Sequence, residues 1–96
     1  MNSKIKDENL DFLFDAILTI KTAEDCNNFL EDLCTVAEIK AMSQRLHVAK
    51  MLHEHHIYSD IVNKTGASTA TISRVNRCLI YGSEGYTTVL ERLEKK

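Results

Sequence analysis

The sequence predicts an all-α protein, built as one small multi-helix domain over residues 1–96. The chain holds only three Gly and no Pro, so it has few signals for the tight turns that join β-strands. Apolar residues make up 44% of the chain and recur at helical rather than alternating spacing. Ser or Thr precedes several of these periodic segments, as is common at helix starts.

The first predicted helix, from about Asp7 to Ile20, is apolar around most of its circumference. One stripe holds Leu10, Leu13, Phe14 and Ile17, and off it lie Phe12, Leu18 and Ile20. Such a helix must be covered on more than one side. A chain of 96 residues forms only a small hydrophobic core, which can hardly cover all of this apolar surface by itself. We therefore expect an intertwined homodimer; burial inside a single chain is the alternative.

Two capping signals predict the next helices. Thr22 followed by Asp25 resembles such a signal and predicts a helix through Leu33. The pair Thr35–Glu38 is a capping box and predicts a long helix over residues 36–54. The expected inner stripe of the long helix consists of Val36, Ile39, Met42, Leu46, Ala49 and Leu52.

The long helix and its C-terminal end contain charged and histidine residues that could bind an anion or a metal ion. Arg45 lies beside the inner stripe, where its permanent charge would need a nearby anion. His53, His55 and His56 could bind a metal ion together with Glu54. Histidines at a helix C-terminus are also favoured by the helix dipole, so we expect no metal site.

The segment from Tyr58 to Tyr81 predicts two short helices that meet at Gly66. Glycine tolerates the left-handed backbone found just past a helix end, and Ser68 can cap the helix that follows. The face turned toward the body of the domain would hold Ile72, Val75 and Leu79. Two helices joined in this way form the pattern of a DNA-binding helix-turn-helix.

The opposite face of the second short helix is small and polar near its start and basic further on. Its candidate DNA-binding residues are Ser68, Thr69, Ala70, Thr71, Ser73, Arg74 and Arg77. In a major groove Thr69 and Ala70 would approach base edges, while hydroxyls and guanidiniums hold phosphates. A helical hairpin with a solvated face is the alternative.

The distribution of charge agrees with double-stranded DNA as a partner. The net charge is −2, but residues 1–38 carry nine acids and three lysines, whereas residues 39–96 carry nine bases and five acids. The acidic part therefore lies upstream of the predicted helix-turn-helix. This arrangement is expected if the N-terminal part faces away from a polyanion.

The rest of the chain predicts a closing helix and no second activity. The helix is expected over Thr87–Lys96, after a loop at Gly82–Gly85, with an inner face of Val89, Leu90 and Leu93. Three cysteines without a CxxC indicate reduced thiols, not a disulfide framework or zinc site; they are Cys26, Cys34 and Cys78. Without a membrane span, signal peptide or catalytic motif, we expect a cytoplasmic protein that is not an enzyme.

Two segments resemble the tryptophan repressor superfamily. LCTVAEIKAMSQRL at residues 33–46 is similar to a family segment of Leu, Thr, acid and a buried Arg. GASTATISR at residues 66–74 is close to the family pattern Gly-Ala-x-x-Ala-Thr-Ile-Thr-Arg. The resemblance implies an intertwined, all-helical homodimer whose two helix-turn-helix units lie about one turn of DNA apart on a pseudo-palindromic operator.

The resemblance also implies a small-molecule corepressor. In the family the ligand lies between two arginines, which match Arg45 and Arg74, and near a threonine, which matches Thr35. Val75, however, stands where the family's pocket has Gly, and Cys78 where it has Ser. Because a valine adds three carbons to a tightly shaped space, this departure argues against L-tryptophan and for a different effector or none.

The sequence thus predicts a sequence-specific DNA-binding transcriptional regulator, a repressor, that acts as a homodimer through its helix-turn-helix. The alternative is a helical dimeric protein-interaction module without specific DNA binding, which the acidic balance of the chain favours.

Overall fold

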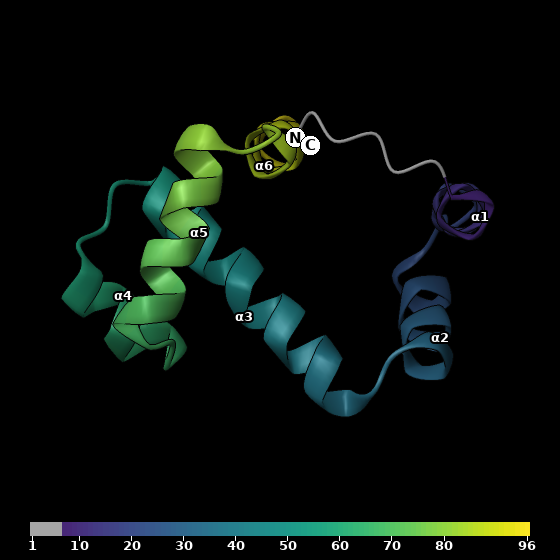
Figure 1. Cartoon of the computed structure of the whole chain (residues 1–96), viewed down its shortest axis with the longest axis horizontal. Helices are drawn as coiled ribbons and strands as arrows, with labels where there is room; N and C mark the ends of the chain where they lie inside the picture. The colour runs from purple at the N-terminus through teal and green to yellow at the C-terminus, as the bar shows by residue number, and fades with distance from the viewer. Residues whose placement is uncertain (1–6) are drawn as a thin grey trace. The chain divides into compact units, whose positions relative to one another are not determined.

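The computed structural model describes residues 7–96, which form six helices and no strand (Figure 1). The helices are α1 (Glu8–Ile17), α2 (Ala23–Leu33), α3 (Val36–His53), α4 (Tyr58–Thr65), α5 (Thr69–Tyr81) and α6 (Gly85–Glu94). The predicted all-α class is confirmed. Among these residues, none of the helices is both long and apolar enough to cross a membrane.

Hydrogen bonds at the starts of α2 and α3 follow the capping signals of the sequence. Thr22 Oγ1 accepts the Asp25 N–H at 3.0 Å. Thr35 Oγ1 accepts the Glu38 N–H at 3.1 Å, and Glu38 Oε1 accepts the Thr35 N–H at 2.8 Å. These bonds satisfy N–H groups that have no partner within the helix, so both starts are encoded by neighbouring residues.

The described chain divides into two units, one up to Ile39 and one from Lys40 to Lys96. In the first unit, neither α1 nor α2 holds a buried residue. Its exposed large apolar side chains include Phe12, Phe14, Ile17, Leu18 and Leu33. Within this unit, much of the apolar surface of α1 and α2 is therefore open to solvent.

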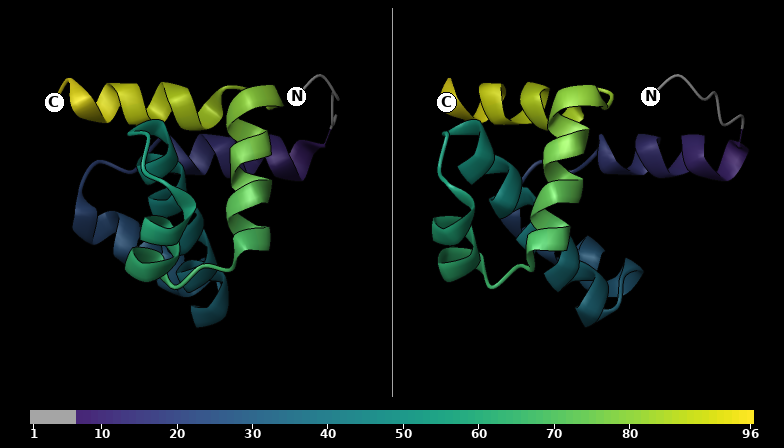
Figure 2. Two further views of the ribbon diagram at one scale, coloured as in Figure 1. Left: turned by 90° about the vertical axis from the view of Figure 1, so that its left-hand side faces the viewer. Right: turned by 60° about the vertical axis from the view of Figure 1, so that its left-hand side comes forward.

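The buried core lies in the second unit and joins α3, α4, α5 and α6. It consists of Val48, Ala49, Met51, Ile61, Ala67, Ile72, Val75 and Leu90. Figure 2 shows α6 near the C-terminal end of α5, while α4 connects to its N-terminal end through a short turn. The core thus holds the two short helices of the predicted helix-turn-helix against α3.

The predicted inner stripe of α3 is confirmed in part. Ala49 is buried, and Ile39 and Leu52 are half-buried, whereas the other three members are exposed: Val36, Met42 and Leu46. Val48 and Met51, which lay outside the predicted stripe, are buried as well. The reason is that Val48 is the first α3 residue in the buried core, so apolar side chains before it, such as Met42 and Leu46, are not part of this core.

The last helix begins and ends earlier than predicted. It runs from Gly85 to Glu94. Of its expected inner face only Leu90 is buried, whereas Val89 and Leu93 are about half exposed. Only a narrow face of α6, around Leu90, therefore packs against the core.

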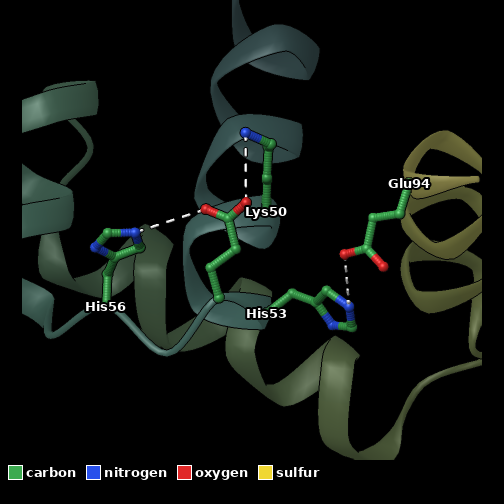
Figure 3. A network of polar contacts seen from close by, with 5 residues as sticks. Lys50, His53, His56 and Glu94 are labelled. Atoms are coloured by element: carbon green, nitrogen blue, oxygen red, sulfur yellow. Dashed lines mark ion pairs between the residues drawn. The ribbon is translucent and has the colours of Figure 1, made fainter.

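Ion pairs gather at the C-terminal end of α3 (Figure 3). Glu54 lies between Lys50 and His56, with N···O distances of 3.5 Å and 3.6 Å. His53 Nε2 lies 3.7 Å from Glu94 Oε2 and links α3 to α6. Between residues 7 and 96, no three His, Cys, Asp or Glu side chains are placed so that they could hold a metal ion.

Candidate nucleic-acid interface

The turn between α4 and α5 is formed at Gly66, as predicted. Gly66 is left-handed, with φ 73°, and its N–H donates to the Val62 carbonyl oxygen at 2.9 Å. A Cβ atom at this position would meet nothing within 4 Å. The glycine is therefore needed for its backbone conformation and not for space.

Thr65, the last residue of α4, closes the turn with its hydroxyl. Its Oγ1 donates to the Ile61 carbonyl oxygen at 2.7 Å and accepts the Ala67 N–H at 3.1 Å. The Thr65 carbonyl oxygen accepts the Gln44 side-chain amide of α3 at 3.3 Å. Sequence reasoning missed both residues. A hydroxyl directly before the turn glycine could have indicated Thr65, but Gln44 has no local signal because its partner is 21 residues away.

The start of α5 is capped by Ser68, as predicted. Ser68 Oγ accepts the Thr71 N–H at 3.1 Å and donates to Thr71 Oγ1, also at 3.1 Å. The predicted inner face is confirmed, because Ile72 and Val75 are buried and Leu79 is half-buried. The opposite face of α5 is therefore turned outward.

Most of the predicted DNA-binding residues lie on the exposed side of α5. Those exposed are Ser68, Thr69, Ala70, Ser73, Arg74 and Arg77. Thr71 is half-buried, and its hydroxyl is already bonded to Ser68. Neither Arg74 nor Arg77 forms an ion pair with any other residue of the described range. The guanidinium groups of both arginines on α5 are therefore open to solvent and available to bind an anion.

The residues matched to an effector site either have exposed side chains or make a structural contact such as a helix cap. Thr35 caps α3 and belongs to the first unit, whereas Arg45 and Arg74 belong to the second. The side chain of Arg45 is exposed and forms no ion pair with the other described residues, so these residues do not supply the anion expected near it. A ligand as the source of that anion stays a prediction. Val75 is only 2% exposed and belongs to the core.

An apolar groove of about 690 Å³ lies at the C-terminal end of α5. Its lining consists of Leu46, Cys78, Tyr81, Gly82, Ser83, Gly85, Tyr86 and Val89. Cys78, one of the two departures from the family pocket, is thus part of a groove that neither Arg45 nor Arg74 lines. All three cysteines are free thiols.

Two short helices joined by a left-handed glycine turn, with a capped and outward-facing second helix, define a helix-turn-helix protein. The chain belongs to the Trp repressor family, because the family model described as Trp repressor protein matches residues 8–94. The chain is thereby placed in a family of helix-turn-helix DNA-binding regulators.

Individual relatives agree with this assignment. The uncharacterized protein YerC of Bacillus subtilis is 50% identical over 92 residues, which are 96% of this chain and 88% of that protein. A TrpR like protein from Eubacterium eligens superposes with a TM-score of 0.92 at 56% identity, covering 97% of this chain and 96% of that one. For a candidate Trp repressor from Staphylococcus aureus the TM-score is 0.91 at 50% identity, with 96% and 92% covered. The resemblance expected from two segments is confirmed.

We expect Gly66→Ala to destabilise the protein by about 1–2 kcal/mol, because an L-residue is strained at a left-handed position. Gly85→Ala is the matched control: its added Cβ also meets nothing within 4 Å, and its backbone is not left-handed. The control should change stability little or raise it by up to about 1 kcal/mol. Thermal unfolding of both variants measures the difference, and equal losses would contradict the assigned role of Gly66.

Proposed function

We propose that the protein is a sequence-specific transcriptional repressor that acts in the cytoplasm as a homodimer on double-stranded DNA. The observation that carries the proposal is the outward face of α5, where small residues precede two arginines that form no ion pair within residues 7–96. Membership of the Trp repressor family supports it.

The order of residues on α5 matches the two tasks of DNA recognition. Thr69 and Ala70 are small and exposed in the first turn, so the helix can approach base edges closely. Arg74 and Arg77 follow one and two turns later, where they can hold phosphates together with the hydroxyls of Thr71 and Ser73. Between Tyr58 and Gly82 the single acid is Asp60. Repulsion from the phosphate backbone is therefore small on this surface.

Selection of bound duplexes from random DNA tests the proposal directly. We expect the wild-type protein to enrich a pseudo-palindromic sequence, and Arg77→Ala to bind the enriched and a scrambled duplex more weakly by a similar factor. In this variant the slope of log K against log salt should become shallower by about 1, because one cationic side chain fewer neutralises a phosphate.

Lys21→Ala removes one charge from an exposed residue between α1 and α2, outside the helix-turn-helix, and serves as the matched control. It should leave both affinity and salt dependence unchanged. If no sequence is enriched over random duplex, specific DNA binding is excluded, and the helical protein-interaction module becomes the better account of the protein.

The uncovered helices of the N-terminal unit support the homodimer. Neither α1 nor α2 holds a buried residue, and Phe12 on α1 is 75% exposed. The exposed Met42 and Leu46 of α3 add further apolar surface in the second unit. Covering large apolar side chains is favourable by about 25 cal/mol per Å². A second copy of the chain offers complementary apolar surface for both units.

We expect Phe12→Asp to convert the dimer to a monomer in sedimentation experiments. Burying an unpaired carboxylate costs on the order of 3 kcal/mol or more. Because a two-fold dimer would bury two of them, association should weaken by roughly ten-thousandfold. Asn28→Asp places the same charge on an exposed polar position of α2 and should remain dimeric. A monomeric wild-type protein, or a Phe12→Asp variant as dimeric as the wild type, would contradict this prediction.

We also propose a carboxylate-bearing small molecule other than L-tryptophan as effector, bound by Arg45 and Arg74. The support is that both arginines are exposed and form no ion pair with other described residues. The buried position of Val75 beside Arg74 supports the exclusion of the indole ring.

A ligand of this class should raise the melting temperature of the wild-type protein, because it binds only the folded state. At a concentration about a hundred times its Kd the gain is about 2.7 kcal/mol. Arg45→Ala should abolish the shift, whereas Lys40→Ala, which removes an exposed charge earlier on α3, should retain it. A library of amino acids and indole compounds without any shift would rule out an effector of this class.

A further inference from the structure

The turn of the helix-turn-helix is tied to α3 by one side chain, Gln44. Its Nε2 donates to the Thr65 carbonyl oxygen at 3.3 Å, and both residues are half-buried. Within residues 7–96, this is the one side-chain hydrogen bond that joins residues more than four positions apart. The bond is therefore tertiary, in contrast to the local caps and turns of the other bonds.

Gln44 bonds to the residue that organises the turn. Carbonyl oxygens in the last turn of a helix lack partners within the helix, and Gln44 supplies one for Thr65. The hydroxyl of the same Thr65 holds the Ile61 carbonyl oxygen and the Ala67 N–H. A donor at position 44 thus reaches the point where α4 ends and the turn begins.

The position of Gln44 on α3 separates it from the core. It precedes Val48, the first buried residue of the helix, by one turn. Its neighbours Met42 and Leu46 are exposed apolar residues that the proposed dimer would cover. Gln44 therefore lies between the surface available to a second copy and the turn that begins the DNA-binding helix.

We propose that Gln44 is a positioning residue for DNA recognition, which holds the turn against the first half of α3 and so sets the direction of α5. The inference rests on the proposed function and adds to it. In a two-fold dimer, one such bond in each subunit would govern the separation and tilt of the two α5 helices, which must match the spacing of the half-sites. Neither Gln44 nor Thr65 belongs to the buried core, which consists of apolar side chains only.

The test uses Gln44→Met in the full-length chain, since methionine keeps the length of the side chain but has no hydrogen-bond donor. In the DNA-free protein, the amides of Gly66 and Ala67 should exchange with solvent about three- to tenfold faster, as expected for the loss of one hydrogen bond. Affinity for the duplex enriched by the wild type should fall by about the same factor. Affinity for a scrambled duplex and the salt dependence should not change, because every side chain that binds a phosphate is kept.

Two further variants sharpen the test. Ser43→Met places the same side chain at the neighbouring exposed position and should behave as the wild type. Gln44→Glu sets an acceptor against the Thr65 carbonyl oxygen, so it should speed exchange at the turn more than Gln44→Met does. This variant keeps the prediction testable if Gln44→Met does not fold.

Unchanged exchange at Gly66 and Ala67 in Gln44→Met would overturn the inference. Faster exchange with an unchanged ratio of specific to scrambled binding would also overturn it, because the bond would then hold the turn without affecting recognition. If the wild-type protein enriches no duplex, the proposed function fails and the role in recognition fails with it. The exchange result would still show, separately, whether Gln44 holds the turn.

Discussion

The packing of Val48, Ile61 and Ile72 into one fully buried cluster is the interaction on which the rest of the functional unit depends. These residues come from α3, α4 and α5, so their burial joins the helix-turn-helix to the helix that precedes it. Apolar burial has no directional preference, however, and cannot by itself set the angle of α5. The left-handed Gly66 and the hydrogen bonds of Thr65 supply that direction.

The two units of the chain use their apolar residues differently. The unit from Lys40 onward buries a core and turns the polar face of α5 outward, whereas neither α1 nor α2 holds a fully buried residue. This difference corresponds to the division of charge, with the acids concentrated in the first 38 residues. The candidate DNA-binding helix therefore lies in the part of the chain with an excess of basic residues, which agrees with membership of a family of DNA-binding regulators although the net charge is −2.

Val75 is a core residue at the position where the resemblance to the family implies an effector pocket. The resemblance to the Trp repressor family implies a glycine beside a ligand at this position, whereas here the valine side chain is buried among the core residues. Its neighbour Arg74 points away from the core and remains exposed. The substitution therefore adds apolar volume to the packing beneath α5, at the position where the resemblance places the ring of a ligand.

The sequence by itself determined the features whose partners lie within a few residues: the caps at Thr22, Thr35 and Ser68, and the left-handed turn at Gly66. It also indicated the family, because GASTATISR combines the turn, the cap and the outward face in one segment. Only the tertiary structure decided which face of α3 is buried, since periodicity identifies an apolar face but not the length over which neighbouring helices cover it. The hydrogen bond from Gln44 to Thr65 could not be predicted from the sequence either, because it depends on the approach of two helices that no local pattern encodes.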